Sequence, residues 1–502
     1  MTKKISLLTL MLISAFTSKA ATLSEKIDSF FKPIVENYLV PVIFWDPIKA
    51  MGFDIGASVP IVVVWLVFGA IYFTFRMNFI NIRGFKHAIG LVKGDYDDPN
   101  DKGEVSHFQA LTTALSATVG LGNIAGVAIA ISIGGPGATF WMIVAGLLGM
   151  SAKFVECTLG IKYRKIDENG EVSGGPMYYL RDGLAKYNMA GFGKLLAVLF
   201  AILCIGGSFG GGNMFQANQA YAQLAGQFPA LAGNGPMFGL ILSVLVGAVI
   251  IGGIKSIASV TEKIVPFMAA LYVGTALIII LLNLTEIGTV FALIFQGAFA
   301  PAAGLGGIVG VLIQGFRRAA FSNEAGVGSA SIAHAAAKTN EPVSEGFVAL
   351  LEPFIDTVVI CTMTALVLII TGFHNVQGVE GAQMTSQAFG SVFSWFPYLL
   401  VIAIFLFAFS TMISWSYYGL KAWTFLFGRT KLSVYSYKLL FLLFIIIGSS
   451  VKLGAVLDFS DMMILAMAFP NIIGLLILSK EVRVDLDDYY SRLKSGVIKR
   501  FK

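Results

Sequence analysis

The sequence predicts an all-α polytopic membrane protein, and three observations lead to this fold class. Of its 502 residues, 56% are hydrophobic and only 13% are charged, about half the charge content of an ordinary soluble domain. Apolar runs long enough to cross a bilayer recur along the chain. Two of these runs are interrupted by glycine and polar residues, which lipid tolerates only where protein or a cavity surrounds the open backbone. Composition therefore excludes a water-soluble domain.

The N-terminus resembles a secretory signal peptide over residues 1–20. Lys3 and Lys4 form a basic start, residues 5–16 are apolar, and residues 18–20 provide a small-residue cleavage site. An uncleaved amphipathic N-terminus remains the alternative. We expect residues 21–58, which are rich in Pro and aromatic residues, to form an external or interfacial segment.

Eleven spans are expected after this segment. An extra transmembrane helix over 59–80 precedes two sets of five spans, which occupy 106–284 and 285–480 and are followed by a basic cytoplasmic tail over 481–502. The spans run over 59–79, 107–133, 139–161, 195–221, 237–254, 264–284, 307–335, 347–371, 397–427, 439–457 and 462–478.

Basic residues predict the orientation of these spans. Most Lys and Arg lie in the loops on one side, together with the C-terminal tail, and the opposite side holds Lys26, Lys32, Lys49 and Lys452. The side rich in Lys and Arg faces the cytoplasm in membrane proteins. We therefore expect a multi-pass protein of the bacterial cytoplasmic (inner) membrane, with the N-terminus outside and the C-terminus inside. The net charge of +6 follows from this topology and does not indicate a nucleic-acid partner.

Each set of five spans opens with a broken helix. The first break, residues 117–126, reads Ala-Thr-Val-Gly-Leu-Gly-Asn-Ile-Ala-Gly, and the second, residues 321–328, reads Phe-Ser-Asn-Glu-Ala-Gly-Val-Gly. Broken helices at corresponding places in two halves indicate the binding site of a secondary transporter. Because the two openers enter from opposite sides, we expect a 5+5 inverted repeat.

The chemistry of the first break suits an amino-acid zwitterion. A broken helix offers free N–H groups to a carboxylate and free carbonyls to an ammonium. Gly120 and Gly122 are expected to expose N–H groups to the substrate carboxylate, and Thr118 and Asn123 to add side-chain contacts. The alternative for the glycines is tight packing between helices.

Four motifs carry a resemblance to a known family. They are the first break with residues 134–137 (Gly-Gly-Pro-Gly), residues 212–218 (Gly-Asn-Met-Phe-Gln-Ala-Asn), residues 321–330 with 332–337, and residues 407–411 with 415–419. Together they resemble the alanine or glycine:cation symporter family (sodium:alanine symporters) over about residues 59–480. The core of residues 119–123 is also similar to the neurotransmitter:sodium symporters, which share the inverted-repeat fold.

The resemblance implies sodium-coupled symport of small neutral amino acids, alanine or glycine. It implies that Gln216 contacts the substrate, although an interhelical hydrogen bond is the alternative for a membrane Gln. Ser322 and Asn323 of the second break join this substrate site. Phe321 and Trp415 form apolar walls that leave room only for a small side chain.

The resemblance also implies a sodium site between the first break and the span over 397–427. Its ligands are the hydroxyls of Ser410 and Thr411 and the backbone carbonyls of Ser116, Val119 and Phe407. The alternative is that both hydroxyls bond to their own helix. Na⁺ is then a co-transported ion, and a second Na⁺ near Thr118, Asn123 and Ser322 is conceivable.

Ionisable residues inside the spans are functional candidates by default. Lys153 and Glu156 are expected to pair. Arg317 and Arg318 are candidates to pair with Glu324 or to act in an outer gate, and Glu352 and Asp356 are candidates to tune cation binding or to carry a proton. For each of these residues, ion pairing is favoured over a proton relay. The scattered histidines and cysteines show no transition-metal spacing.

Two other functions remain open. A proton-coupled amino-acid symporter would use the same fold, and an ion channel would need a continuous polar pore or a charged ring. An enzyme is not expected, because the sequence shows no nucleophile–base or metal constellation. The expected partners are a small amino acid, Na⁺ and the lipid bilayer. A monomer is compatible with the sequence, which leaves the oligomeric state, the enantiomer and the stoichiometry open.

Overall fold

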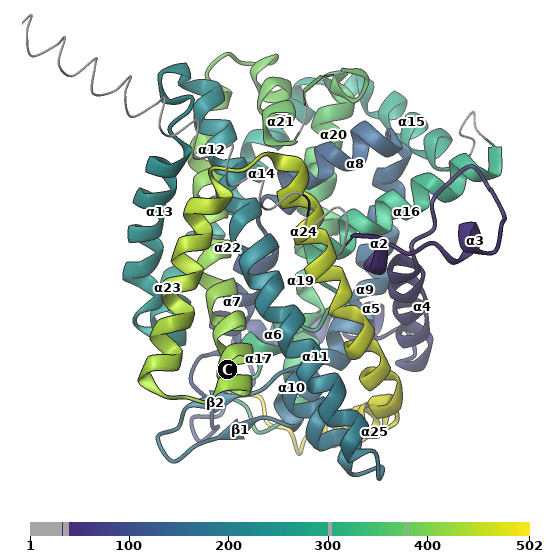
Figure 1. Ribbon diagram of the computed structural model, residues 1–502. Helices are drawn as coiled ribbons and strands as arrows, with labels where there is room; N and C mark the ends of the chain where they lie inside the picture. The colour runs from purple at the N-terminus through teal and green to yellow at the C-terminus, as the bar shows by residue number, and fades with distance from the viewer. Residues whose placement is uncertain (1–32, 34–39, 300–303, 377, 380, 502) are drawn as a thin grey trace, which may run out of the picture.

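The computed structural model describes residues 33, 40–299, 304–376, 378–379 and 381–501. The signal peptide predicted over residues 1–20 lies outside the described residues. Figure 1 shows long helices standing side by side in one bundle. Two short antiparallel strands, β1 (Lys165–Ile166) and β2 (Val172–Ser173), lie at the same end of the bundle as the C-terminus. We call this end the C-terminal face.

One longer helix and several short ones precede the first break. α4 (Ile61–Arg76) follows Pro60, whose φ of −60° suits a helix start. It corresponds to the extra helix predicted over 59–80. The short helices are α2 (Val40–Ile43), α3 (Pro47–Ala50), α5 (Ile80–Arg83) and α6 (Phe85–Val92).

The first broken helix consists of three segments. α7 (His107–Thr118) starts at a capping box in which Ser106 and Gln109 exchange side-chain to backbone hydrogen bonds. After the break the chain continues as η2 (Gly122–Gly126) and α8 (Val127–Gly134), bent by 50° from α7. The bend lies at the glycines that the sequence singled out.

The first half continues with helices that carry the chain to the second break. They are α9 (Gly137–Lys162), α10 (Pro176–Tyr178), η3 (Tyr179–Gly183), α11 (Ala190–Phe209), η4 (Gly210–Met214), α12 (Phe215–Gln227), η5 (Pro229–Leu231), α13 (Gly235–Ile250), α14 (Gly253–Leu282), η6 (Leu284–Glu286) and α15 (Ile287–Phe299).

The second broken helix runs in the opposite direction to the first. It consists of α16 (Gly304–Asn323) and α17 (Ala330–His334), separated by residues 324–329. In Figure 1 the first broken helix rises from α7 to α8 near the top, whereas the second descends from α16 to α17. The helices after it are α18 (Pro342–Ala349), α19 (Leu351–Pro353), η7 (Phe354–Cys361), α20 (Thr362–Ile370), η8 (Phe373–Asn375), α21 (Gly381–Gly390), α22 (Phe396–Phe427), α23 (Lys431–Gly448), α24 (Leu453–Ala466) and α25 (Ala468–Lys494).

The predicted class, an all-α membrane fold with two broken helices, is confirmed. Among the described residues, seven helices are long and apolar enough to cross a membrane, or eight if the bent pair around the first break is one span. Three shorter apolar helices add to these, α4, α13 and residues 284–299. The count of eleven spans stays a prediction.

One predicted span is divided in two. The span predicted over 439–457 contains a turn, because α23 ends at Gly448 and α24 begins at Leu453. Gly448, Ser449, Ser450 and Lys452 lie at this turn, and such residues are typical of turns. α25 continues without interruption to Lys494, into the predicted tail.

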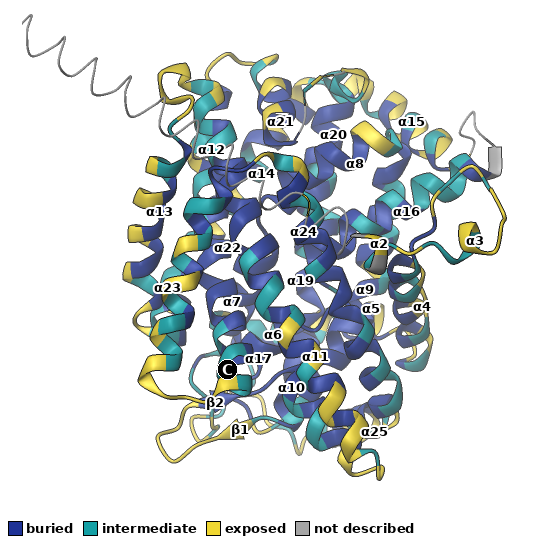
Figure 2. Ribbon diagram, viewed as in Figure 1, coloured by how far each residue is buried: buried dark blue, intermediate teal, exposed yellow. Residues whose placement is uncertain are grey.

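Burial is arranged as expected for a protein in lipid. Figure 2 shows buried residues along the centre of the bundle and exposed residues on outer helices such as α13 and α23. Several of the exposed side chains are apolar, including Leu240 at 50%, Val244 at 67% and Leu439 at 62%. Water would disfavour such a surface, whereas acyl chains match it.

Candidate functional site

The first break holds its backbone amides inside the protein. Beyond α7 the backbone leaves helical geometry, with a ψ of 83° at Val119. The Gly120 N–H donates to Oδ1 of Asn123 at 2.8 Å, and the Leu121 N–H donates to Oε1 of Gln216 at 3.1 Å. The two amide side chains thus satisfy donors that a helix interruption leaves without an intrahelical partner.

Gln216 links the first break to a neighbouring helix. It is the second residue of α12, and its Nε2 donates to the Gly211 carbonyl at 2.8 Å while its Oε1 accepts from Leu121. The interhelical hydrogen bond weighed for this residue is therefore present. Its contact with substrate stays a prediction.

The two breaks meet in space. A Cβ atom at Gly122 would lie 3.3 Å from Cα of Ser322, and one at Gly120 would lie 3.1 Å from Oε1 of Gln216. Thr411 of α22 approaches Gly120 still more closely, at 2.5 Å from the position of a Cβ. The glycines of the first break thus allow the second break and α22 to reach its backbone.

Asp356, expected from the sequence only as a candidate to tune cation binding or to carry a proton, joins the two breaks. One carboxylate oxygen of this η7 residue accepts from Nδ2 of Asn123 at 2.6 Å. The other accepts from the hydroxyls of Ser322 at 2.9 Å and Thr357 at 2.7 Å. The sequence marks Asp356 as an ionisable residue inside a span. It does not show the contacts with Ser322 and Asn123, which lie 34 and 233 positions away in the sequence.

The second break is organised around Glu324. Its φ of 55° lies in the left-handed region, directly after α16 ends. One carboxylate oxygen accepts from the Trp415 indole N–H at 3.0 Å, and the other accepts from the Ser329 hydroxyl. The carboxyl group of Glu324 therefore connects the second break to α22.

The predicted apolar walls lie beside this contact. Trp415 is 1% exposed, and Phe321 packs edge to face against Phe215 with ring centroids 5.3 Å apart. Gly212 has no room for a side chain, because a Cβ there would collide with the Trp415 ring. Phe215 of α12 and Gly212 of η4 thus hold the side chains of Phe321 and Trp415 in place.

Two further predicted site residues lie at the breaks. The Thr118 hydroxyl donates to the Ala114 carbonyl of its own helix at 3.2 Å. The Asn323 side chain donates to Oγ1 of Thr357 at 2.9 Å and accepts from the Ala325 N–H at 2.9 Å. Thr118 thus bonds within its own helix, whereas Asn323 bonds both to the backbone of the second break and to η7.

The predicted sodium ligands lie between α7 and α22. The Thr411 hydroxyl donates to the Ser116 carbonyl at 2.9 Å, and the Ser116 hydroxyl donates to the Ser410 carbonyl at 2.7 Å. The Ser410 hydroxyl donates to the Phe407 carbonyl of its own helix at 3.1 Å. Val119 is buried at the end of α7. Oxygen atoms from both helices thus gather here, as a hard cation requires.

Ion pairing inside the bundle differs from two expectations. Arg317 and Arg318 pair with Asp461 of α24, and Arg317 lies 2.8 Å from its carboxylate. The proposed pairing of these arginines with Glu324 was wrong. Lys153 pairs with Glu352 at 3.3 Å rather than with its helical neighbour. Removing one partner of a buried pair would leave a charge without compensation in the interior, which is strongly destabilising.

One group of side chains has the composition of a metal site. Ligand atoms of Cys157, His334 and Glu352 lie within 4.8 Å of one another, and all three residues are buried. His334 and Glu352 are bonded to each other, and the Lys153 ammonium lies 3.3 Å from Glu352. Because a neighbouring cation repels a metal ion, we assign no metal here.

Comparison with known proteins agrees with this architecture. The model of the sodium:alanine symporter family matches residues 50–502. The sodium/alanine symporter AgcS of Methanococcus maripaludis is 43% identical over 84% of this chain and 92% of its own length. GlnT of Bacillus subtilis, described as a probable sodium/glutamine symporter, is 38% identical over 87% of this chain and 89% of its own.

A solved structure also aligns with the chain. The crystal structure of MhsT in complex with L-phenylalanine has 15% sequence identity and a TM-score of 0.46, and the alignment covers 76% of this chain and 99% of that one. The family match spans both breaks, α22 and the helices around them. The chain therefore belongs to the sodium:alanine symporter family.

Proposed function

We propose that this sodium-coupled amino-acid symporter carries a small neutral amino acid, alanine or glycine, into the cell together with Na⁺. The observation that carries the proposal is the meeting of the two breaks at Gly122 and Ser322, with Asp356 bonded to both sides. Such a junction of broken helices is where secondary transporters bind substrate and ion.

The substrate carboxylate binds the amides of the first break. Gly120 and Leu121 now donate to the side chains of Asn123 and Gln216. A carboxylate oxygen takes over these donors, and the released amide side chains then bind the zwitterion. Because an amide offers both donors and acceptors, Gln216 suits either end of the substrate.

The walls determine substrate size. Phe321 and Trp415 are buried against packed neighbours, so a larger side chain would have to displace them. An apolar pocket distinguishes one methylene by about 1–3 kcal/mol. Alanine and glycine are therefore favoured over longer neutral amino acids.

Na⁺ binds between α7 and α22, where Ser116, Val119, Phe407, Ser410 and Thr411 supply oxygens. Its binding orders the first break against α22 and so raises the affinity for the amino acid, and this coupling is reciprocal. A second cation position near Thr118, Asn123 and Ser322 gains support from Asp356, because a carboxylate favours a cation there. The broken helices then rock against the other helices to give alternating access.

The C-terminal face lies toward the cytoplasm of a bacterial inner membrane. Lys and Arg concentrate in the loops on that side, which supports the assignment. Residues 1–20 are a signal peptide, 21–58 an external segment, and 106–284 and 285–480 two five-helix repeats. Residues 481–502 form a basic end that extends α25 at the cytoplasmic side.

Uptake by proteoliposomes tests the function. With an inward Na⁺ gradient, the reconstituted protein should accumulate labelled alanine, and replacing Na⁺ by choline should abolish accumulation. Ser322→Ala should weaken uptake. The control Ser259→Ala removes an exposed hydroxyl of α14 that bonds only to its own helix and should match the wild type.

Other outcomes would favour the alternatives. Accumulation driven by a proton gradient in choline would indicate proton coupling. Single-channel currents without saturable alanine flux would indicate a channel.

A further inference from the structure

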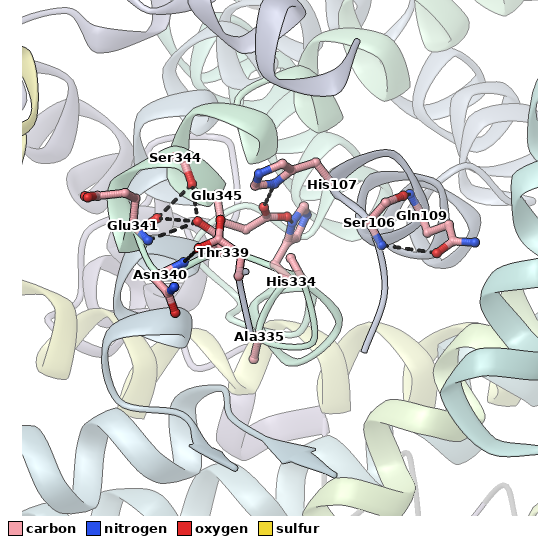
Figure 3. Close-up of polar contacts among 12 residues, drawn as sticks. Ser106, His107, Gln109, His334, Ala335, Thr339, Asn340, Glu341, Ser344 and Glu345 are labelled. Atoms are coloured by element: carbon pink, nitrogen blue, oxygen red, sulfur yellow. Dashed lines mark hydrogen bonds and ion pairs between the residues drawn. The ribbon is translucent and has the colours of Figure 1, made fainter. Parts of the chain in front are cut away.

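Five ionisable side chains form a buried row at the ends of both broken helices. His107 is the first residue of α7 and His334 the last of α17, and both contact the Glu345 carboxylate, His334 at 2.5 Å. The other ring nitrogen of His334 contacts Glu352, whose second oxygen lies 3.3 Å from Nζ of Lys153. Figure 3 shows His107, His334 and Glu345 pointing toward one another. We call these five residues the His–Glu row.

The hydrogen bonds of His334 require an additional proton. An ionised carboxylate only accepts hydrogen bonds, and a neutral imidazole has one N–H and one acceptor nitrogen. His334 has a carboxylate oxygen at each ring nitrogen, Glu345 at Nδ1 and Glu352 at Nε2. Either the imidazole is a cation or one carboxyl group is protonated. The row is complete only when it holds this proton.

Charge balance leads to the same conclusion. The side chains of Lys153, His334, Glu345 and Glu352 have no exposed surface. With the proton, the ammonium and the imidazolium balance two carboxylates. Without it, these four side chains together carry one net negative charge, and burial disfavours a charge that is not balanced.

The groups around the row carry charges of both signs. Asp97 and Asp101 lie near His107, and the Arg164 guanidinium interacts with Glu345 and Asp101. Near Lys153 and Glu352 lie Glu156, Cys157, Glu324 and Tyr418. The carboxylates of Glu156 and Glu324 accept hydrogen bonds from Asn471 and from Trp415 and Ser329. Lys153 forms its ion pair with Glu352, and the charges of Glu156 and Glu324 also act on it.

His107 provides the route to solvent. Its side chain is 4% exposed, and it follows the loop that carries Asp97 and Asp101. The side chains of the other four members have no exposed surface. We therefore expect the row to exchange its proton with solution through His107, at the C-terminal face.

We propose that the His–Glu row is a binding site for one exchangeable proton, and that this proton holds the ends of both broken helices against α18 and α19. Loss of the proton to solvent places a lone pair of His334 against a carboxylate oxygen. The repulsion separates α17 or α7 from α18 and so favours opening at the C-terminal face. The effect on transport rests on the proposed function, because alternating access requires these ends to move.

The variant Glu352→Gln distinguishes the effect of the proton from the effect of side-chain packing. The amide has nearly the shape of the carboxylate. Its NH₂ group can donate to the acceptor nitrogen of a neutral His334, and its carbonyl can accept from Lys153. Lys153 and Glu345 then balance each other in charge. Every contact of the row is kept, and the exchangeable proton is no longer needed.

The test measures sodium-driven alanine uptake in proteoliposomes with equal pH on both sides, between about pH 6 and pH 9. The wild-type rate should rise with pH by up to about tenfold per unit, the limit for one proton. Glu352→Gln should transport at a rate that does not vary with pH. The control Glu262→Gln makes the same chemical change at a side chain that binds Gln109 outside the row and should keep the wild-type profile.

The outcomes are distinct. A wild-type rate that does not vary with pH overturns the proposal without any variant, and so does an unchanged profile in a folded Glu352→Gln. If Glu352→Gln does not fold, His107→Gln serves as the second variant and should displace the wild-type profile along the pH axis. Absence of sodium-driven uptake at every pH would contradict the proposed function instead.

Discussion

Asn123 and Asp356 face each other where the first broken helix meets η7, with the amide nitrogen 2.6 Å from a carboxylate oxygen. The same carboxylate accepts the Ser322 hydroxyl of the second broken helix at 2.9 Å. One negative charge therefore connects both interruptions, and the three residues share a buried environment. This arrangement gives the proposed cation site its strongest electrostatic feature.

Asp356→Asn should weaken Na⁺ binding. The variant keeps the size of the side chain but removes the charge, so we expect Na⁺ to bind about tenfold more weakly or worse, a difference of roughly 1.4 kcal/mol. Alanine binding measured against Na⁺ concentration checks this. Asp182→Asn, which removes a carboxylate paired with Arg181 near the surface, is the control. An unchanged Na⁺ dependence would exclude Asp356 from the cation site.

Thr411→Ala should affect Na⁺ dependence more than Ser410→Ala. The Thr411 hydroxyl bonds across to Ser116 of α7, whereas the Ser410 hydroxyl bonds within its own helix to Phe407. Loss of the first removes an oxygen between the two helices, and loss of the second removes a local bond. Na⁺ titrations of alanine uptake on both variants measure the difference. The reverse order would contradict the assignment of Thr411.

Much of the fold could be predicted because broken helices leave a local signal. The glycines and Asn123 of the first break, and the sequence Phe321–Gly328 of the second, interrupt apolar runs where lipid permits no open backbone. The turn between α23 and α24 also left a signal, because Gly448, Ser449, Ser450 and Lys452 interrupt the apolar run, but the predicted span extended across them. Hydropathy alone places such a turn poorly.

The site could be predicted only in part, because its contacts join distant residues. Asn123 and Ser322 were expected at the site from their own motifs. Asp356 and the partners of Glu324 depend on how η7 and α22 pack, and sequence spacing carries no information on this. His107, His334 and Glu345 likewise come together only in the folded chain, from α7, α17 and α18.

The substitutions Gly122→Ala and Gly126→Ala should differ in their effects on alanine binding and stability, although both positions lie in η2. A Cβ at Gly122 meets Cα of Ser322 at 3.3 Å, whereas one at Gly126 has nothing within 4 Å. We expect Gly122→Ala to separate the breaks and lower alanine affinity, and Gly126→Ala to be neutral or to stabilise by up to about 1 kcal/mol. Binding assays and thermal unfolding measure both. Equal effects would show that the breaks do not need this close contact.

Arg164→Lys should destabilise the C-terminal face. The guanidinium donates to four backbone carbonyls, those of Ala335 and Ala337 through Nη1 at 2.8 and 2.6 Å and those of Lys102 and Thr339 through Nη2 at 2.8 and 2.6 Å. An ammonium cannot reproduce this planar fork. We expect a loss of about 2–4 kcal/mol, as for several charged hydrogen bonds that do not add fully.

Thermal unfolding in detergent measures the effect of Arg164→Lys, with Arg429→Lys as the control. Arg429 pairs with Asp167 at 3.3 Å on the surface, where an ion pair contributes little. A similar unfolding temperature for both variants would contradict the role of the four carbonyl contacts.

His87 should make the protein less stable in mild acid. It lies in α6 with one hydrogen bond, to the Tyr489 hydroxyl at 2.8 Å, and burial lowers its pKa from 6.5 to about 4. The unfolded chain therefore binds a proton near pH 6.5 that the folded protein refuses until about pH 4. Stability falls wherever the unfolded state holds more protons, so it declines as pH drops through this window and levels off below it.

The variant His87→Gln tests the predicted direction of this pH dependence. The amide can still bond to Tyr489 but does not titrate, so the variant should lose less thermal stability than the wild type between pH 7.5 and pH 5. The loss of thermal stability between the two pH values is compared within each protein. A change in packing that affects stability equally at both pH values therefore does not contribute. An equal loss in the variant would mean that other groups, and not this buried imidazole, take up the protons on unfolding. His87, which bonds to a tyrosine hydroxyl, also differs from His107 and His334, which both contact the Glu345 carboxylate.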